Sequence, residues 1–442
     1  MKTAIIVGAG HRALTYAQLA EVQPERLKIV GVADPNPFRR QMVAERFGLS
    51  EDMCFESAEA LARRERLADA VINGTMDADH VPTTIPLLEK GYHVLLEKPF
   101  AISAEEVKLL EAAVKRTQRH VMICHVLRYA PFYTEIKKRI LNGDIGEIIS
   151  IHTSEHVSYH HIANCFVRGK WRRSDVCKSS MLVQKCCHDL DLLCWFLSGI
   201  APVRLSSLGG RKLFCAEKAP ENSGTYCQLD CPLEKECDYS VRRMHLNHPV
   251  AWNTYVWPKH AYTPELNNHE QRLKEAMQPD FPHSRCVWKC NNNQIDRQCV
   301  MITFADGTVA THDLVTNTAL PMRKIHIVGT AGEIEGVFDE NKFVIRHRDL
   351  CPEDTFCGNT EELVDITACG DTTGATGDHG GGDLRLAMDF VNLVSGKPTG
   401  ISCTTLADSL NGHKLVFAAD TAMIQKNRVM FDDFSARDEK RY

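Results

Sequence analysis

Two glycines near the start of the chain are placed to bind a dinucleotide. The stretch Thr3 to Arg12 runs from an apolar strand into Gly8-Ala9-Gly10, and helix-forming residues follow. Glycines at such a turn let the backbone approach a pyrophosphate, and the N–H groups at the start of the next helix can bind its oxygens. The pattern predicts a dinucleotide site, although Ala13 stands where the third glycine of the usual fingerprint is expected.

Asp34 ends the next apolar run and can accept hydrogen bonds from the ribose hydroxyls of the cofactor. Its charge favours NAD, because a carboxylate repels the 2′-phosphate of NADP. Arg39 and Arg40 lie on the following helix and could reach such a phosphate, but exposed helical arginines are usually solvated. We therefore expect NAD, with NADP as the less favoured alternative.

Cysteines gather in a polar, irregular stretch from about residue 215 to 297, which we interpret as an insertion. The most compact group is Cys227-x3-Cys231-x5-Cys237, and the same stretch contains Cys215, Cys286 and Cys290. In a reduced compartment such thiolates can hold a structural Zn²⁺ that pins a segment without a core. The spacing is not that of a standard zinc finger. An iron–sulfur cluster, unbonded buried thiols and disulfides are the alternatives.

Two loop segments carry residues suited to a polyhydroxylated substrate. Tyr159 and His161 follow a predicted strand, and Trp171-Arg172 comes soon after. Aromatic rings can stack on the C–H face of a sugar while polar groups bind its hydroxyls. In Gly377 to Asp383, three consecutive glycines precede a helix and permit close backbone approach to a ligand. His379 and Asp383 are candidate substrate contacts, and Asp383 could instead cap the helix.

The elements that must position these residues form two predicted domains. Over residues 1–125, short apolar runs alternate with amphipathic stretches, which predicts a doubly wound parallel sheet. The expected strands are Ala4–Val7, Lys28–Ala33, Ala70–Asn73, His93–Leu96 and Val121–Cys124. We interpret this part as an NAD(P)-binding Rossmann domain.

Residues 126–442 predict an α+β domain for substrate binding and oligomerisation, with a large, open, mostly antiparallel sheet. Asp306-Gly307 is a strong hairpin signal. The expected strands are Ile148–His156, Gln298–Phe304, Val309–Leu314, Lys324–Val328, Ile334–Phe338 and Lys342–Arg348. The expected helices are about Pro131–Asn142, His188–Leu197, Asp383–Ser395 and Thr405–Lys426.

Composition narrows the class of protein. The chain has 442 residues and a net charge of −5, with no long run of one sign, so neither nucleic acid nor an anionic membrane is an expected partner. No apolar stretch approaches the roughly 20 residues that cross a bilayer. The first strand begins at residue 3, which leaves no room for a secretory leader, and a cytoplasmic enzyme is the expectation.

Four motifs together resemble one family. Besides Gly8-Ala-Gly-His-Arg12, they are the segment Thr75 to His80, Glu97-Lys98-Pro99 and His188-Asp-Leu-Asp191. They resemble the glucose-fructose oxidoreductase, inositol dehydrogenase and rhizopine-catabolism (Gfo/Idh/MocA) family. The resemblance covers nearly the whole chain, and the Glu-Lys-Pro element is its most specific part.

The resemblance implies a Rossmann domain joined to an open-faced sheet, and a reaction that oxidises or reduces sugars, cyclitols or their derivatives with NAD or NADP. Lys98 is then the active-site lysine beside the nicotinamide, and His188 the general acid or base. A homodimer or homotetramer is expected. The expected cofactor contacts are Gly8, Gly10, His11, Arg12, Asp34, Thr75, Asp77, His80, Glu97, Lys98, Arg128, Trp171 and Arg172.

The chain departs from the family pattern just before the histidine. Many relatives carry an aspartate four residues earlier, where this chain has Gln184, followed by Lys185. We expect Lys185 to position the substrate or transfer a proton. Asp191 lies one turn along the same helical face and could orient His188 or charge the helix start. Tyr159, His161, Lys185, Asp191, His379 and Asp383 form the expected substrate site.

A second reaction class fits the resemblance. NAD-dependent glycosidases of similar sequence oxidise a sugar at C3, eliminate the aglycone, add water and reduce the sugar again. The additional lysine and the missing aspartate keep this redox-neutral alternative open beside the dehydrogenase.

Overall fold

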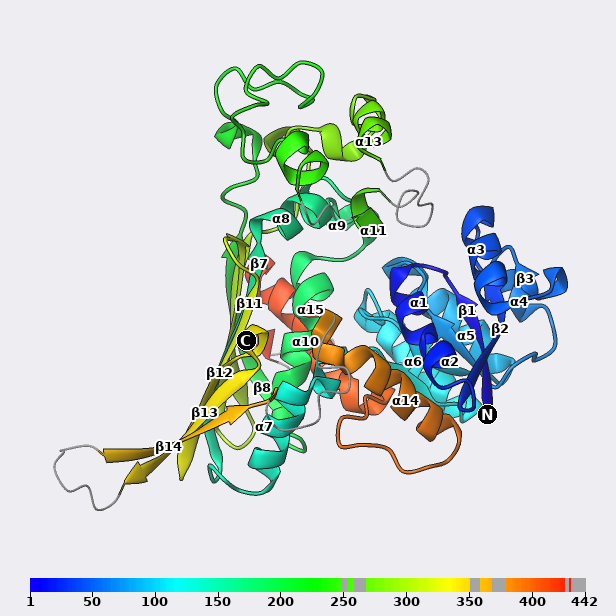
Figure 1. Ribbon diagram of the computed structural model, residues 1–442. Helices are drawn as coiled ribbons and strands as arrows, with labels where there is room; N and C mark the ends of the chain where they lie inside the picture. Colours follow the sequence, from blue (N-terminus) through cyan, green and yellow to red (C-terminus); the bar gives the residue numbers. More distant parts are fainter. Residues whose placement is uncertain (249–252, 258–267, 350–357, 368–377, 426–428, 431–442) are drawn as a thin grey trace.

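A computed structural model describes residues 1–248, 253–257, 268–349, 358–367, 378–425 and 429–430. The chain forms two sheets with helices between them (Figure 1). Among the described residues, no helix is both long and apolar enough to cross a membrane. The segments 249–252, 258–267, 350–357, 368–377, 426–428 and 431–442 lie outside this description, and part of the predicted Gly377 to Asp383 segment falls in them.

The first sheet has six parallel strands in the order β3-β2-β1-β4-β5-β6, as predicted for a Rossmann domain. Its strands are β1 (Lys2–Val7), β2 (Leu27–Ala33), β3 (Cys54–Phe55), β4 (Ala70–Asn73), β5 (His93–Leu96) and β6 (Val121–Ile123). The helices packed on it include α1 (His11–Ala17), α2 (Leu19–Val22), α3 (Pro37–Phe47), α4 (Ala58–Ala62), α5 (His80–Glu89) and α6 (Ala104–Thr117). The strand order reverses between β1 and β4, where such sheets bind dinucleotides at their carboxyl edge.

The second sheet has nine strands in the order β14-β13-β12-β11-β7-β10-β9-β8-β15. Among the described strands of this sheet, only β7 and β10 pair in parallel, so the predicted mostly antiparallel sheet is confirmed. The strands are β7 (Ile148–Ser158), β8 (Pro202–Gly210), β9 (Arg297–Phe304), β10 (Val309–Thr318), β11 (Met322–Gly329), β12 (Gly332–Val337), β13 (Lys342–Asp349), β14 (Gly358–Asp365) and β15 (Val429–Met430).

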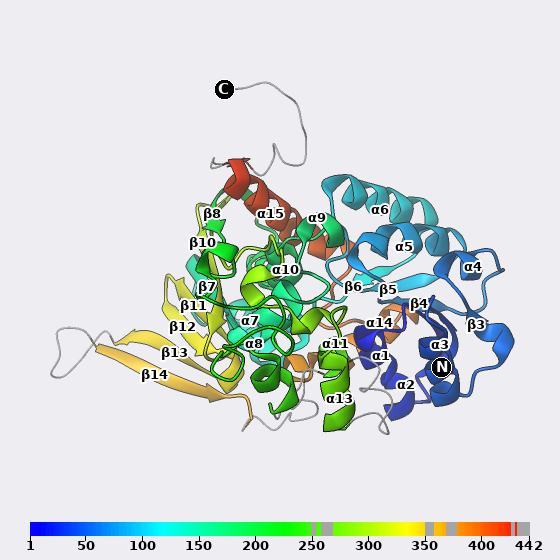
Figure 2. The same ribbon diagram turned by 90° about the horizontal axis from the view of Figure 1, so that it is seen from above.

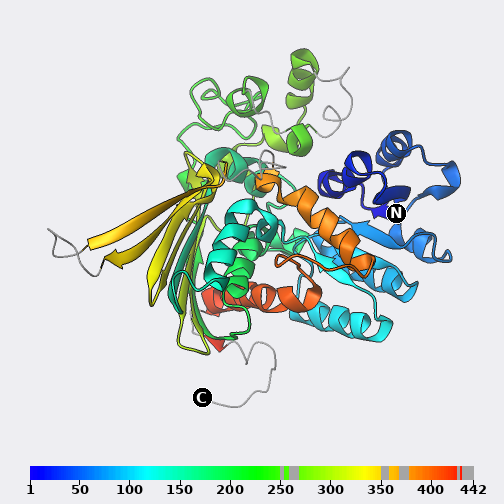
Figure 3. The same cartoon turned by 60° about the horizontal axis from the view of Figure 1, so that its bottom comes forward.

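Helices α7 (Pro131–Leu141), α10 (Met181–Phe196) and α15 (Leu406–Gln425) lie between the second sheet and the Rossmann domain (Figure 1). Helix α14 (Gly382–Val394) instead packs against α1, and its Leu386 and Phe390 join the hydrophobic cluster of β1 and β2 (Figure 3). The domain boundary at residue 125 stays a prediction. Helix α14 follows this boundary in the sequence but packs on the core of the Rossmann domain, so the two domains do not separate cleanly at one residue.

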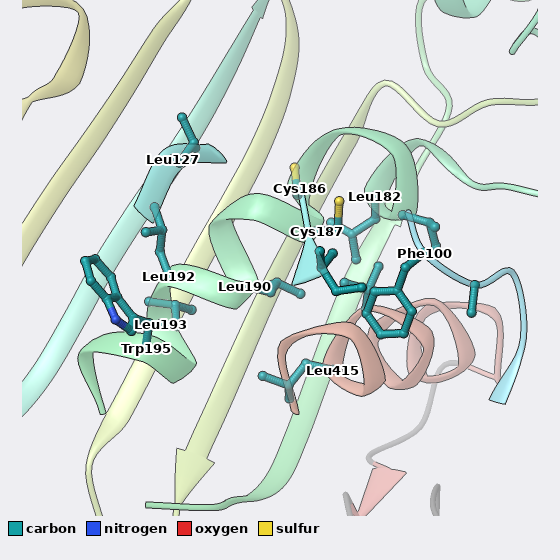
Figure 4. Close-up of a cluster of buried hydrophobic side chains, with 14 of the residues drawn as sticks. Phe100, Leu127, Leu182, Cys186, Cys187, Leu190, Leu192, Leu193, Trp195 and Leu415 are labelled. Atoms are coloured by element: carbon teal, nitrogen blue, oxygen red, sulfur yellow. The ribbon is translucent and has the colours of Figure 1, made fainter. Parts of the chain in front are cut away.

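Helix α10 begins at Met181, seven residues before the expected start at His188, and that prediction was wrong. Ser180 caps it by accepting a hydrogen bond from the Val183 N–H at 3.1 Å. Nearly every residue of α10 is buried, so no polar stripe marks its first two turns. Cys186 and Cys187 are fully buried in the apolar cluster around α10 (Figure 4). His188 therefore lies inside a rigid helix, not at its free end.

Two short helices, α8 (Tyr159–His161) and α9 (Ser174–Cys177), precede α10. The insertion contains α11 (Asn253–Val256) and α13 (His269–Ala276). Helix α11 approaches the Rossmann domain, since the Tyr255 ring lies 6.5 Å from that of His11 at the start of α1 (Figure 2). The insertion thus extends from the second sheet toward the carboxyl edge of the first.

Candidate active site

Two adjoining cavities lie at the carboxyl edge of the Rossmann sheet, between it and the second domain. One is bordered by the Gly8 turn, Asp34 and Arg39, and the other by Lys98 and His188. Both cavities share the lining residues Gly10, His11, Gly74, Thr75, Met76, Cys165, Lys170, Trp171 and Tyr255. A dinucleotide bound at the glycine turn would extend with its adenosine in the first cavity and its nicotinamide in the second.

The glycine turn leaves no space for a side chain at Gly8. Gly8 has φ +77°, and a Cβ atom there would lie 2.7 Å from the backbone nitrogen of Thr75. An ideal Cβ on Gly74 would lie 2.9 Å from the Cβ of Ala13. Gly74 therefore provides the close helix–strand packing for which the missing third glycine normally serves. The turn fits a pyrophosphate at the N-terminus of α1.

Asp34 is held in place by the backbone around it. Its carboxylate accepts hydrogen bonds from the N–H groups of Ala9 (2.7 Å) and Asn36 (2.8 Å). Arg40 donates to the Asp34 carbonyl oxygen at 2.6 Å, while Arg39 Nη1 lies 3.9 Å from the carboxylate. Of the two arginines, only Arg39 borders the cavity. The site therefore presents a fixed carboxylate with one cation beside it.

Arg12 joins three acidic or phenolic groups at the base of the second cavity. Its guanidinium donates to Glu97 Oε1 at 3.0 Å, to the Tyr16 hydroxyl at 2.5 Å and to the carboxylate of Asp383. Burial alone would raise the pKa of Glu97, but the charges of Arg12 and Lys98 outweigh it and hold this pKa below its usual value. Arg12, Glu97 and Asp383 thus form an ionic network between α1, β5 and α14.

Lys98 follows β5 and reaches across to the second domain. Its Nζ donates to the backbone carbonyl of Gln184 on α10 at 2.8 Å. The Nε2 of Gln184 is buried, lines the cavity and has no hydrogen-bond partner among the described residues. The backbone N–H of Lys98 donates to Glu97 Oε2 at 2.7 Å, which fixes the start of the side chain. A cation and an unused amide donor therefore face the cavity together.

His188 lines the same cavity one turn further along α10. It is 4% exposed, and its Nδ1 has no hydrogen-bond partner within the described part of the chain. Burial, together with the positive charge of Lys98, lowers the pKa of His188 well below its usual value. The rings of His125 and His379 lie 5.6 and 6.0 Å from the His188 ring. An uncharged imidazole at this place can accept a proton.

Lys185 is paired with a carboxylate that sequence reasoning missed. Its Nζ lies 3.0 Å from Glu155 Oε1, on β7. Arg323 of β11 contacts both Glu155 (2.7 Å) and Asp189 (3.0 Å). Burial raises the pKa of Glu155 against the opposing charges of Arg323 and Lys185. No local motif marks Glu155 or Arg323, because the pairs join strands to a helix far away in the sequence.

The loop after β4 is ordered by His80. Its Nδ1 contacts the Pro99 carbonyl at 2.7 Å and its Nε2 the Thr75 carbonyl at 3.1 Å, so it links the loops after β4 and β5. Asp77 Oδ2 is buried without a hydrogen-bond partner in the described structure and lines the cavity. Thr75, Asp77 and His80 thus lie where a cofactor contact was expected.

The wall facing the Rossmann domain comes from the second domain and its insertion. Lys170 lies 4.3 Å from the Trp171 ring centroid, and the Tyr255 ring lies 6.0 Å from that of Trp171. Arg172 and His283 border the adenosine side of the cavity. Sequence reasoning missed Lys170, Tyr255 and His283, since nothing in an irregular insertion indicated that it returns to the cofactor.

Three other expected site residues occupy different surroundings. Asp191 is fully buried and forms a two-bond ion pair with Arg128, at 2.7 and 2.6 Å. Neither residue borders the two cavities, and Tyr159 does not border them either. We leave Arg128, Asp191 and Tyr159 out of the proposed site. His161 does line the second cavity, and burial lowers its pKa well below the usual value.

His379 lies in the segment that precedes α14, and Asp383 lies in the first turn of α14. His379 Nδ1 lies 3.4 Å from Asp383 Oδ2, and His379 lines the second cavity. Burial opposes ionisation of Asp383, but the hydrogen bond from His379 and the charge of Arg12 lower its pKa to about 2. His379 faces the substrate side, while Asp383 binds Arg12 and His379.

The cysteines proposed to bind zinc line a separate cavity in the insertion. Cys227, Cys231 and Cys237 share it with Cys286. Within the described residues, no three of these thiols come within 4.8 Å of one another. The sulfurs around a tetrahedral Zn²⁺ are about 3.8 Å apart, because each Zn–S bond is about 2.3 Å long. The spacing of the thiols does not support the zinc prediction.

Known proteins resemble the chain over different shares of its length. The YteT protein of Bacillus subtilis (strain 168) is 24% identical over 401 residues, which is 88% of each chain. The scyllo-inositol 2-dehydrogenase (NAD(+)) of the same strain is 31% identical over 144 residues, or 33% of this chain and 41% of the relative.

Solved structures share the fold. An oxidoreductase from Agrobacterium radiobacter, in complex with NAD+, L-tartaric acid and magnesium, matches with a TM-score of 0.67 at 15% identity, over 98% of both chains. A levoglucosan dehydrogenase in complex with NADH and L-sorbose matches with a TM-score of 0.66 at 18% identity, over 97% of this chain and 98% of the other.

Two family models match most of the chain. One describes the NAD-binding Rossmann fold of an oxidoreductase family and matches residues 2–125, and the other describes its C-terminal alpha/beta domain and matches residues 137–430. With the glycine turn and the paired cavities, these matches place the chain in the Gfo/Idh/MocA family of NAD-dependent oxidoreductases that act on CH–OH groups.

Proposed function

We propose that this protein transfers a hydride between NAD and a secondary alcohol or ketone of a sugar, cyclitol or sugar derivative. One observation carries the proposal: Lys98 and His188, from different domains, line one cavity that adjoins the pocket of Gly8 and Asp34. Relatives support the substrate class, since an inositol 2-dehydrogenase of Rubrobacter xylanophilus is 27% identical over 197 residues.

His188 and Lys98 have different roles in the proposed reaction. Bound NAD supplies the hydride acceptor. His188, uncharged at neutral pH, takes the proton of the substrate hydroxyl, while Lys98 stabilises the negative charge that develops on the same oxygen. The C–H bond electrons leave with the hydride, and the C–O bond becomes a carbonyl. In the reverse direction His188 returns the proton.

The remaining cavity residues suit a ligand with several hydroxyls. Gln184 offers its unused Nε2–H donors, and Lys185, His161 and His379 surround the same space. We assign these four residues to substrate binding. Lys185 is anchored by Glu155, so we assign it a positioning role and leave proton transfer to His188.

We further propose that the outer face of the second sheet joins subunits into a homodimer or homotetramer. Ile149, Met301 and Leu363 are exposed on this sheet by 53%, 52% and 62%. Apolar residues exposed on strands favour burial against another subunit.

A panel of sugars, inositols and aryl glycosides tests the proposed reaction. The purified protein is incubated with NAD and each compound, and NADH and released aglycone are measured in the same sample. We expect net NADH with at least one polyol and no aglycone. Release of aglycone without net NADH would favour the redox-neutral glycosidase, and absence of both products from the whole panel would contradict the substrate class.

Asp34→Asn is expected to weaken the preference for NAD over NADP by about tenfold or more, or ~1.4 kcal/mol. The amide keeps an acceptor for the Ala9 N–H but loses the charge that repels a 2′-phosphate, and Arg39 is freed to bind it. Titration with NAD and NADP gives the ratio of dissociation constants. Asp52→Asn, on the exposed start of a short helix, is the control. An unchanged ratio in Asp34→Asn would remove Asp34 from cofactor selection.

For alcohol oxidation, we expect kcat/KM to fall on the acid side of its pH profile only below pH 6.5. Only uncharged His188 accepts the proton, so kcat/KM falls as His188 becomes protonated. Burial and the charge of Lys98 lower this pKa, which moves the loss of activity to lower pH than for an ordinary histidine. Measurement of kcat/KM across the pH range of stability locates this fall. A fall centred at pH 6.5 or above would contradict the assignment of His188.

A further inference from the structure

Four cysteine side chains of the insertion surround one cavity of about 340 Å³. They are Cys227, Cys231, Cys237 and Cys286, all present as free thiols. The backbone brings the two cysteine segments together, because the Cys227 N–H donates to the Ser284 carbonyl at 2.7 Å and the Cys286 N–H to the Thr225 carbonyl at 2.9 Å. Pairing of residues 225–227 with residues 284–286 thus brings Cys227 and Cys286 to the same cavity.

A buried cation lies against these thiols. Arg168 is 1% exposed and also lines the cavity. Its Nη2 lies 3.5 Å from Cys227 Sγ and donates to the Tyr239 carbonyl at 2.7 Å, while its Nε donates to the Arg285 carbonyl at 2.6 Å. Its Nη1 is buried and has no partner among the residues that the structure describes. A buried guanidinium with an unused donor indicates that the cavity holds an anionic group.

The spacing of the thiols decides which group fits. The four thiols line one cavity, and no three of the described cysteines lie within 4.8 Å of one another, so they do not converge on one point. A single Zn²⁺ requires sulfurs about 3.8 Å apart. The four ligands of an iron–sulfur cluster lie further apart, because several iron and sulfide atoms stand between them. Cys290 does not line the cavity, and its Sγ donates to the Cys286 carbonyl at 3.1 Å.

We propose that Cys227, Cys231, Cys237 and Cys286 ligate a [4Fe–4S] cluster, with Arg168 as the cation that offsets its negative charge. The four thiolates supply one ligand to each iron. The remaining walls include the apolar Leu233, Val287 and Trp288 and the acidic Glu234, Glu236 and Asp238. Glu234 is paired with Arg242 at 3.2 Å and Asp238 with Arg243 at 3.1 Å, which offsets two of these charges. The cluster's role is structural, and no electron transfer is required of it.

The position of the cluster connects it to the cofactor pocket. Arg168 directly precedes Gly169 to Arg172, and the insertion also supplies Tyr255 and His283 to that pocket. Binding of the thiols to one cluster would hold this wall in place. Loss of the cluster is therefore expected to weaken NAD binding by several-fold, through disorder of the wall and not through a direct contact.

Metal analysis of the wild-type protein is the primary test. The full chain is produced in iron-replete cells and purified without oxygen or chelator, and iron, zinc and acid-labile sulfide are measured per chain. A portion is also reconstituted with ferrous iron and sulfide. We expect about four irons and four sulfides, with broad absorbance at roughly 400 nm. One zinc without iron, or less than about one iron after reconstitution, would overturn the proposal.

Single substitutions then test the ligands. Cys231→Ser and Cys237→Ser are expected to lower bound iron at least about fourfold, whereas Cys215→Ser, in the same insertion but outside the cavity, retains it. Equal iron loss in Cys215→Ser, or full iron content in both ligand variants, would contradict the assignment. The wild-type analysis remains decisive if a variant does not fold, and it is independent of whether the proposed sugar oxidation is found.

Discussion

Replacement of Lys98 by methionine is expected to lower kcat by on the order of 10²- to 10³-fold, with NAD affinity within about threefold of the wild type. Methionine keeps much of the apolar stem but removes the cation to which we assign stabilisation of the alcohol oxygen. The interaction strengthens as negative charge develops on that oxygen, so its loss falls on the transition state more than on binding. Steady-state kinetics and a separate NAD titration measure the two effects.

Lys137 offers a matched control for Lys98. Both lysines donate to backbone carbonyls of α10, Lys98 to Gln184 at 2.8 Å and Lys137 to Trp195 at 2.6 Å. Lys137 lies outside both cavities. Lys137→Met should reduce thermal stability and leave kcat per folded protein nearly unchanged. If both variants lost turnover equally, the effect of Lys98 would be structural, and its catalytic role would be rejected.

His188→Asn is expected to lower kcat by on the order of 10²- to 10⁴-fold, because the proton of the substrate hydroxyl loses its acceptor. Asparagine preserves polarity and some of the volume in a helix that is buried on nearly every side. The loss should be largest at neutral pH and should shrink as pH rises, since hydroxide can then take over the proton. Rates measured from pH 6 to 10 would reveal this dependence.

His125 is the matched control for His188. Its ring lies 5.6 Å from that of His188 and is equally buried, but it does not line either cavity. His125→Asn should cost less than about tenfold in kcat, through small shifts of its neighbour. Retention of wild-type activity by His188→Asn, or an equal loss in both variants, would show that the base lies elsewhere.

The Rossmann half of the site could be predicted because its signals are local. A strand, a glycine turn and Asp34 follow one another within 34 residues, and the sheet topology brings Lys98 to the same edge. The sequence alone does not show which residue compensates for the missing third glycine. Gly74 comes from a different loop, and only the packing of β4 beside β1 shows that it faces Ala13.

The half of the site that the second domain contributes depends on contacts between residues far apart in the sequence. Helix α10 has no polar stripe, so its first two turns gave no periodic signal. The departure from the family pattern at Gln184 and Lys185 was visible, but its structural meaning was not. Glu155, on β7, binds Lys185 and so places a carboxylate near the site from a different element. The return of Tyr255 to the cofactor pocket likewise depends on the path of the insertion.

Transfer of deuterium from the substrate to the cofactor is the direct test of hydride transfer to NAD. The best substrate of the panel, deuterated at its carbinol carbons, is mixed with NAD and a stoichiometric amount of protein, and the mass of the cofactor is measured. We expect NADH heavier by one deuterium in the wild type and unlabelled NAD with Lys98→Met on the same timescale. Formation of product while the cofactor stays unlabelled would contradict hydride transfer to NAD at this site.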